Sequence, residues 1–423
     1  MYKFLIIALL FVSVFSWAQD SINTQKIDTL TYQYVDSVSH AFYLTGNWKK
    51  LEMTGKQAID QQIDFKRLRQ RMGYAYFAQA DYFAAKYQYE KALEFDKSDA
   101  DTRIYLYYCG LYTGNEAYAR YQMSYLSPQT QKLLNMNALK FIDALDFEYN
   151  YKINDNSTRS NPSYYKIGIS TKLGYRLNLY QAVSYFSQWQ TRTIPNDILK
   201  ITDSSFKNQT EYYGSIAWQA TSSLSVSAAY HGFNATVDDT VTIINPKLLP
   251  ANKNYKVINK KNYLFQGNMI FGKLSLRLNR FDISFSASSL KMDSTSTSQI
   301  GIHAGYMIPG QANLYIKSSL IGLIDNNTNR LIFSQNIGLI LLKNTRLDGN
   351  VTVGNLKNYA EFDGLYVYNS DDETLFKTGF TFYWSATKNI TFFSNCSYNY
   401  KQISNSTTTY NQQSLSGGII WKL

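Results

Sequence analysis

The sequence predicts an α+β protein of two domains, an all-α repeat domain followed by an antiparallel up-and-down transmembrane β-barrel of about fourteen strands. Three observations support this fold class. Residues 28–140 place apolar side chains at helical spacing, whereas the chain after about residue 141 alternates apolar and polar residues. Short and long connections also alternate in that second part. The composition of 37 Tyr and 24 Phe against 6 Pro suits long strands.

The first residues have the pattern of a secretory signal peptide. Lys3 supplies a positive charge, Phe4–Phe15 is an apolar stretch too short for a spanning helix, and Ser16 and Ala18 are the small residues of a cleavage site. The alternative is a retained N-terminal anchor. We expect a signal peptide, a periplasmic helical-repeat domain and an outer-membrane barrel at residues 1–18, 19–140 and 141–423.

Beyond this signal no stretch has the roughly 18 uninterrupted apolar residues of a spanning helix. A membrane form of this chain therefore requires a closed barrel, because lipid leaves an open sheet edge unsatisfied. The net charge of +11 suits anionic glycans or lipopolysaccharide, but the basic residues are scattered, so we expect no nucleic-acid partner. Cys109 and Cys396 fall in different predicted domains, which disfavours a disulfide.

A repeat is visible in the helical part. Small and aromatic residues recur at regular spacing within residues 66–99, namely Gly73, Tyr76, Ala85, Tyr89 and Ala92. A shift of about 34 residues in either direction finds weaker copies. We therefore expect three repeats and a closing helix, near residues 32–65, 66–99, 100–133 and 127–140.

This pattern resembles the tetratricopeptide repeat. The resemblance implies stacked helix pairs whose concave surface binds a peptide or protein, here a periplasmic partner. The candidate partner surface consists of tyrosines, Tyr74, Tyr82, Tyr105, Tyr107, Tyr108 and Tyr112. The alternative is that most of them pack between helices.

Period-two alternation is clearest at residues 281–288, where Phe, Ile and Ala at odd positions oppose Asp and Ser at even positions. Segments of this kind are long enough for tilted strands to cross a bilayer. We predict strands near 142–153, 162–174, 178–191, 209–220, 223–236, 261–275, 280–293, 297–308, 312–325, 330–342, 345–357, 372–386, 389–404 and 409–422.

The connections give the predicted barrel a direction. Links after the even strands are tight, whereas long links follow some odd strands, at residues 191–208, 237–260 and 357–371. An even strand number places both ends of the barrel on the short-turn side, where the helical domain must also lie. The final strand carries Trp421 two places before Leu423, and resembles the strand that barrel-assembly machinery recognises. The alternative fold is a soluble β-sandwich.

We find no catalytic constellation, and expect neither an enzyme nor a cofactor or metal. His40, His231 and His303 lack metal-ligand spacing. Candidate lumen-lining residues are polar positions on the predicted inner face, Lys166, Lys172, Asp282, His303, Lys317, Arg346, Asp348, Lys377 and Lys401. Two interpretations stay open, a wet conduit for anionic or polar solutes and a filled lumen with paired charges. The link 237–260 is the candidate for an inward-folding plug.

The order of signal, repeats and barrel resembles the export porins for exopolysaccharides and the smaller YaiO-type barrel proteins. The resemblance implies a bacterial outer-membrane channel or export porin for a polysaccharide or other polar solute, with a repeat domain that docks a periplasmic protein. The alternatives are a non-conducting scaffold or surface-presentation protein, and a barrel-embedded hydrolase.

Overall fold

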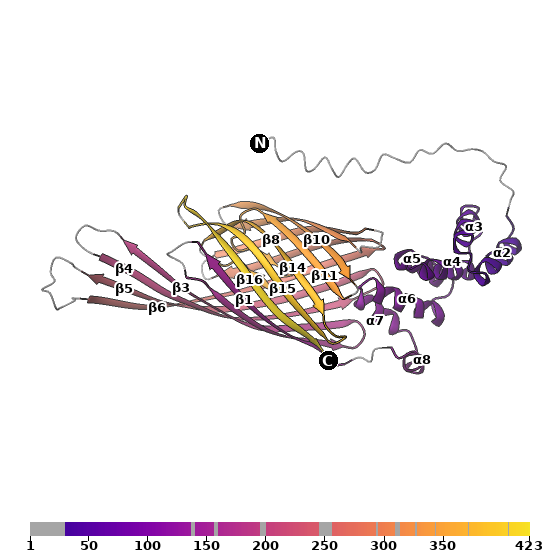
Figure 1. The fold of residues 1–423 in the computed structure, drawn as a ribbon, viewed down its shortest axis with the longest axis horizontal. Helices are drawn as coiled ribbons and strands as arrows, with labels where there is room; N and C mark the ends of the chain where they lie inside the picture. Colours follow the sequence, from indigo (N-terminus) through magenta and orange to yellow (C-terminus); the bar gives the residue numbers. More distant parts are fainter. Residues whose placement is uncertain are drawn as a thin grey trace, which may run out of the picture.

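A computed structural model describes most of the chain after residue 29. The described ranges are residues 30–136, 140–155, 160–194, 200–244, 256–292, 295–308, 314–325, 328–342, 344–370, 372–404 and 406–423. Within them, seven helices precede a closed antiparallel barrel of fourteen strands, which confirms the predicted fold class (Figure 1).

The helices form three consecutive pairs and one short final helix. Their bounds are α2 Tyr32–Leu44, α3 Trp48–Asp60, α4 Lys66–Ala78, α5 Tyr82–Phe95, α6 Ala100–Tyr112, α7 Glu116–Met123 and α8 Pro128–Leu133. The first helices of the pairs begin at residues 32, 66 and 100 and the second helices at 48, 82 and 116, so both series repeat every 34 residues. The assignment of these pairs to the tetratricopeptide family stays a prediction.

Local sequence explains where these helices start and how closely they pack. Asp81 and Asn115 accept backbone N–H bonds at the starts of α5 and α7, which satisfies donors that a helix leaves free. Ala85 and Ala92 are fully buried between helices. At Gly110 an added Cβ would lie 2.9 Å from the backbone nitrogen of Ala119, so α6 and α7 need a glycine at their contact.

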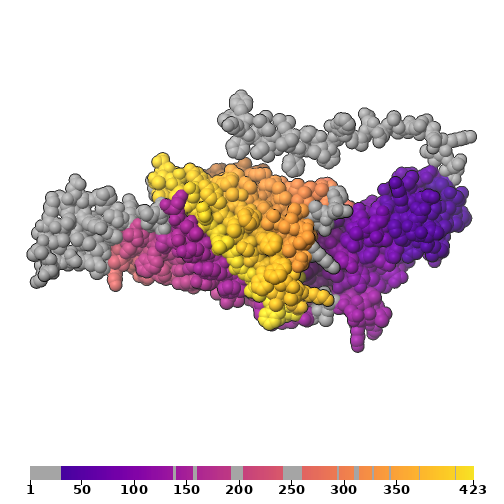
Figure 2. Space-filling view, viewed as in Figure 1, coloured from indigo at the N-terminus to yellow at the C-terminus, as the bar shows by residue number. Residues whose placement is uncertain are grey.

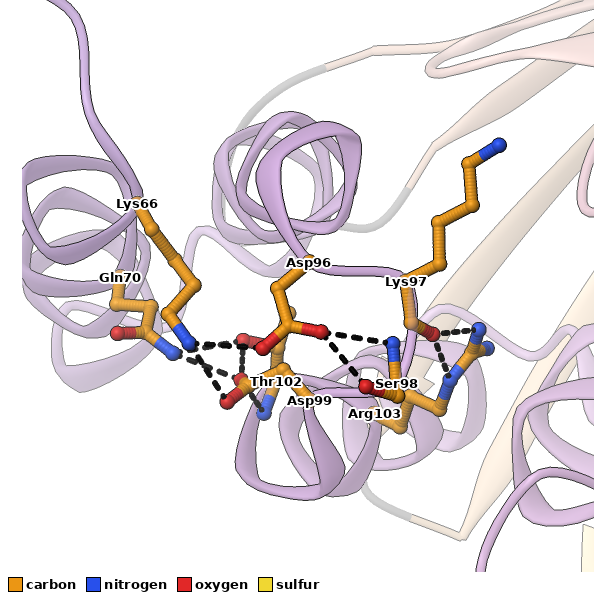
Figure 3. Close-up of polar contacts among 8 residues, drawn as sticks. All are labelled: Lys66, Gln70, Asp96, Lys97, Ser98, Asp99, Thr102 and Arg103. Atoms are coloured by element: carbon orange, nitrogen blue, oxygen red, sulfur yellow. Dashed lines mark hydrogen bonds and ion pairs between the residues drawn. The ribbon is translucent and has the colours of Figure 1, made fainter.

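A polar cluster ties α4 to the turn between α5 and α6 (Figure 3). The Lys66 ammonium lies 3.0 Å from Asp96 and 3.4 Å from Asp99, while Gln70 donates to Asp99 at 2.8 Å. Hydrogen bonds from Ser98, together with Lys66, lower the pKa of Asp96 to about 2. The cluster therefore joins the second repeat to the third through charged groups.

The strands follow the predicted order, with one addition. Their bounds are β1 Ile142–Asn154, β2 Ser163–Leu173, β3 Leu177–Ile194, β4 Lys200–Gln219, β5 Leu224–Ile244, β6 Lys256–Leu278, β7 Phe281–Met292, β8 Thr295–Met307, β9 Tyr315–Asp325, β10 Asn329–Leu342, β11 Thr345–Val353, β12 Ala360–Glu361, β13 Tyr366–Val367, β14 Glu373–Ser385, β15 Ile390–Gln402 and β16 Thr409–Lys422. The small β12–β13 hairpin is separate from the barrel sheet.

Pairing between β1 and β16 closes the sheet. Their register runs from Ala144 opposite Lys422 to Asn154 opposite Gln412. The predicted alternation holds in β7, where Ser284 and Ser286 are buried inward while Phe281 and Phe285 are exposed on the outer wall. No helix within the described ranges has the length and apolar character needed to cross a membrane.

Strands β3 to β6 are longer than the sequence predicts. The predicted loops 191–208 and 237–260 are wrong over most of their described length, because β3 reaches Ile194, β5 reaches Ile244 and β6 begins at Lys256. These strands continue past the rest of the barrel on the side away from the helices (Figure 1). Cross-strand bonds pair some of the polar side chains there, as Asn262 donates to Asp238 at 2.6 Å. Residues 245–255 lie outside the described ranges.

The helical domain lies against the short-turn end of the barrel (Figure 2). Asp81 of α5 lies 2.7 Å from Arg280 in the β6–β7 turn, and Glu116 of α7 lies 2.9 Å from Lys422 of β16. Arg176 in the β2–β3 turn donates to the Tyr125 hydroxyl at 2.9 Å. Since β16 and β7 are seven positions apart in the ring of fourteen strands, these contacts join opposite sides of the rim.

Replacement Gly110→Val is expected to destabilise the helical domain by about 1–3 kcal/mol, because the new side chain overpacks against the α7 backbone. Thermal unfolding of the full chain in detergent, followed by circular dichroism at 222 nm, measures this. Ala100→Val, at the exposed start of the same helix, is the matched control. Equal melting temperatures for the two variants would contradict the packing argument.

The lowered pKa of Asp96 predicts an acid-sensitive helical domain. The folded-state pKa of about 2 lies below the ordinary value of 3.8, so the carboxylate stabilises the fold above about pH 4, and this contribution is lost as the pH falls toward 2. Asp96→Asn should melt below wild type at pH 6 and together with it at pH 2. Asp101→Asn, in the exposed first turn of α6, is the control. A constant gap from pH 6 to pH 2 would refute the linkage.

Candidate functional site in the barrel lumen

The segment between β11 and β14 enters the barrel. It covers residues 354–370 and 372, and we call it the inward segment. The sequence predicts a long outer link at residues 357–371 and an inward-folding plug at 237–260. The structure corrects both, because residues 237–244 and 256–260 are strand, whereas the β12–β13 hairpin contacts the lumen wall.

The tip of this hairpin docks on the far wall of the lumen. Phe362, Asp363 and Gly364 all have positive φ, which produces the tight reversal at the tip. The Asp363 carbonyl accepts a bond from Tyr213 at 3.2 Å, and the Gly364 carbonyl lies 2.9 Å from Nδ1 of His231. Tyr213 and His231 belong to β4 and β5, and β5 is seven positions from β14 in the ring of fourteen. The inward segment therefore spans the lumen.

Apolar contacts hold both ends of the inward segment. Near its start, Leu356 and Tyr359 pack against Ile321 and Ile332 of the lumen wall. Nearer its end, Leu365 and Val367 pack in the cluster that contains Met269 and Phe271. Burial of this kind gains about 25 cal/mol per Å² of apolar surface, so the segment is a folded part of the lumen and not a loose loop.

Charged contacts add to this packing. The Lys377 ammonium lies 2.6 Å from Glu361 and donates to the Tyr368 hydroxyl at 2.7 Å. Toward the seam, Tyr366 donates to Glu148 of β1 at 2.6 Å, and Lys166 of β2 lies 3.1 Å from the same carboxylate. The inward segment thus supplies further polar partners to buried charges of the lumen wall.

A third ion pair reaches the tip of the hairpin. Asp363 lies 3.0 Å from the ammonium of Lys273 on β6. Near it, His231 is 2% exposed, and its Nε2 lies 3.4 Å from Glu211 of β4. Ser184 also donates to Glu211 at 2.7 Å. The far wall therefore presents a prearranged polar site for the hairpin tip.

The structure places the remaining candidate lumen residues in local polar contacts. Lys172 pairs with Asp143, Asp282 with Arg277, and Arg346 with Asp348. His303 lies between the hydroxyls of Ser286 and Ser319, each 2.8 Å from a ring nitrogen. Lys401 lies 3.5 Å from Ser370 of the inward segment. Most of the candidates are therefore paired charges in an obstructed lumen.

A chamber of about 240 Å³ lies beside the inward segment. Tyr359 to Asp363 form one wall, and the opposite lining comes from the short-turn half of β8 to β11 and β14. Of the predicted lumen residues it collects His303, Lys317 and Asp348. A larger recess of about 820 Å³ surrounds Gly232 and the outward-facing Tyr212 and Tyr230, and it holds no comparable group of charges within the described residues.

The candidate tyrosines of the helical domain form one aromatic strip. Ring centroids lie 5.8 Å apart for Tyr74 and Tyr105, 4.5 Å for Tyr82 and Tyr112, and 6.4 Å for Tyr108 and Tyr112. Phe77 connects these pairs through contacts with Tyr105 and Tyr82. Tyr112 is 57% exposed, the other members of the strip are partly buried, and Tyr107 is buried in a separate cluster.

The described residues give little support for catalysis. The Ser286–His303 pair has Ser319, and not a carboxylate, at the second ring nitrogen, so the acid that orients a catalytic histidine is replaced by a hydroxyl. Nowhere in the described ranges do three His, Cys, Asp or Glu side chains gather in a metal-binding group.

Sequence reasoning missed the inward segment, although a signal was present. Where the segment docks, strands carry apolar residues on both faces, at 269–271, 320–324 and 331–333. A barrel strand that faces lipid on one side and water on the other alternates instead. Doubly apolar stretches therefore indicate an apolar partner inside the lumen.

Comparisons with known proteins find no matching family model and no match among curated proteins. Solved structures resemble the barrel only loosely. They include the Ralstonia pickettii toluene transporter TbuX, at TM-score 0.43 and 8% identity over 67% of this chain and 89% of that chain. A bacterial polysaccharide outer membrane secretin has TM-score 0.39 and 7% identity over 68% and 100% of the two chains. The KdgM porin has TM-score 0.30 and 10% identity over 66% and 99%. None of these values carries an argument about function.

The tip of the hairpin offers a direct test of the docking. Gly364→Ala should loosen the inward segment, because φ is +87° there and the new Cβ would lie 2.1 Å from the Met269 methyl carbon. We expect amide hydrogen exchange across residues 358–368 to accelerate about tenfold, which corresponds to a strain of 1–2 kcal/mol. Gly272→Ala, on β6 with open space around the glycine, is the control. Equal exchange in both variants would contradict the docking.

Proposed function

We propose that this protein is a bacterial outer-membrane channel for polar solutes, that the inward segment holds it closed, and that the helical domain faces the periplasm. The observation that carries the proposal is the inward segment itself. It crosses a lumen whose wall is polar, and noncovalent contacts hold it there. A pathway that is obstructed by a separately folded hairpin opens when those contacts break.

The outer wall supports a membrane location. Exposed tyrosines and tryptophans gather near both ends of the barrel, with mainly aliphatic residues and some phenylalanines, among them Phe147, Phe285 and Phe380, between them. Near the short-turn end the exposed aromatic residues include Trp218, Phe281, Trp384, Phe392 and Trp421, and near the other end Tyr151, Tyr165, Tyr185, Tyr212, Tyr230 and Tyr398. The intervening exposed residues include Ile167, Val183, Ile216, Ile270, Phe285 and Ile300. An apolar band between two aromatic girdles matches the profile of an outer-membrane bilayer.

The helical domain gives the proposed channel its orientation. Short turns face the periplasm in outer-membrane barrels, and the helices lie against the short-turn end. The aromatic strip around Tyr82 and Tyr112 is the surface that we propose for a periplasmic protein partner, since stacked helix pairs bind extended peptides in this way. A narrower form of the proposal is that the transported solute is a polysaccharide, as in the export porins.

A non-conducting scaffold is the second candidate function. The apolar packing of Leu356 and Tyr359 favours it, because a plug with its own buried core costs more to displace than one held by polar contacts alone. In that case the barrel serves only to anchor the helical domain.

Planar-bilayer recording separates the two functions. If the inward segment is a gate, replacement of residues 357–371 by a Gly-Ser linker should give steady conductance where wild type is mostly silent. Lys377→Gln, which breaks the contacts with Glu361 and Tyr368, should give intermittent openings. Lys172→Gln is the matched control, because it breaks an ion pair with Asp143 that does not involve the inward segment.

One result would contradict the channel function. A linker variant that folds, as shown by its β-strand circular dichroism, and passes no current would support the non-conducting scaffold. Openings in Lys172→Gln as frequent as in Lys377→Gln would remove the inward segment from the explanation.

A further inference from the structure

One cation of the chamber stands apart from the paired charges around it. Three carboxylates line the chamber, and each has its own partner, with Asp363 bound to Lys273, Glu361 to Lys377, and Asp348 to Arg346, at 3.0, 2.6 and 2.9 Å. Lys317 also lines the chamber, but within the described ranges its ammonium makes no ion pair or hydrogen bond. When the partner cations outside the lining are counted, the three ion pairs cancel and Lys317 leaves one surplus positive charge.

Hydrogen-bonding groups extend from this cation along the wall. Lys317 lies opposite Asn336 in the β9–β10 register, and Asn336 lies opposite Asn350 in the β10–β11 register. Directly opposed residues on one face of a sheet have Cβ atoms about 5 Å apart, so the three side chains form one row. Neither asparagine amide has a side-chain hydrogen bond to another described residue, and both line the chamber.

A glycine flanks this row on each side. Gly305 lies opposite Lys317 on β8, and Gly379 lies opposite Asn350 on β14. Two tyrosines, Tyr315 and Tyr383, add aromatic surface to the lining.

We propose that the chamber is a binding site for a small hydroxylated organic anion, a solute of the acidic-sugar class. Lys317 binds the carboxylate, and the amides of Asn336 and Asn350 bind the hydroxylated edge. A volume of about 240 Å³ lies just below the range of roughly 300–1,000 Å³ for drug-sized ligands, and so holds one small solute. This proposal names the solute class of the proposed channel. Binding in the chamber does not depend on the channel function, but a role of the bound solute in transport rests on it.

Calorimetric titration of the full-length protein in detergent at low salt tests the site. The probes are galacturonate, galactose and inorganic phosphate. Galacturonate should bind about tenfold or more tighter than galactose, since a hydrogen bond to a charged group is worth about 1.5–3 kcal/mol. It should also bind tighter than phosphate, which lacks the hydroxylated ring. Equal binding of galacturonate and galactose, equal binding of galacturonate and phosphate, or no binding at all would overturn the proposal.

Variants locate the binding. Lys317→Gln should weaken galacturonate about tenfold or more and leave galactose unchanged, and Asn350→Ala should weaken both sugars by a smaller factor. Lys172→Gln is the matched control, because it removes a lumen lysine outside the chamber and should bind as wild type does. Wild-type affinity in folded Lys317→Gln and Asn350→Ala variants would overturn the site.

This measurement is independent of conduction. If galacturonate binds the wild-type protein but the linker variant does not conduct, the binding site is supported and the channel function is contradicted. Conduction by the linker variant, together with no galacturonate binding to the wild-type protein, would do the reverse.

Discussion

Closure of the sheet between β1 and β16 is the constraint on which the rest of the molecule depends. Lipid offers no hydrogen bonds, so each strand in the apolar band needs a neighbour on both sides. The register from Ala144–Lys422 to Asn154–Gln412 provides the last of these pairings. Closure in turn defines an inside, and it fixes the two faces of every strand as an outer apolar wall and an inner polar one.

The inner wall of this barrel carries many charged side chains. The inward segment supplies hydrogen-bonding and ion-pair partners to several of them. It brings Glu361, Asp363 and Tyr366 to lysines and carboxylates on opposite walls. It also divides the lumen, so that the chamber with Lys317 lies on the helical-domain side of the obstruction. The inward segment therefore both obstructs the lumen and forms one wall of the chamber.

Much of this architecture is readable from the sequence because it rests on local periodicity. Gly73, Ala85 and Ala92 reveal the 34-residue spacing of the helix pairs, and the alternation at 281–288 gives both the strand and its lipid-facing side. The sequence-based predictions fail in two places. Asp238 and Asn262 suggest a loop, but they bond to each other across a hairpin, and single-strand patterns do not contain that pairing. The contacts of the inward segment likewise join residues far apart in sequence, such as Tyr366 and Glu148, so no local pattern in 354–372 announces them.

The position of the β12–β13 hairpin has a consequence for biogenesis. Its partners include Glu148 and Lys166 on the first two strands, and Asp372 just after it bonds to Tyr410 on the last strand. These partners lie on both sides of the seam, so the docking site of the hairpin is complete only when β16 pairs with β1. The hairpin links β11 and β14 at the long-loop end and reaches the lumen from that end. Docking of the hairpin therefore depends on sealing of the barrel, and the contacts with Glu148 and Tyr410 in turn connect the inward segment to both seam strands.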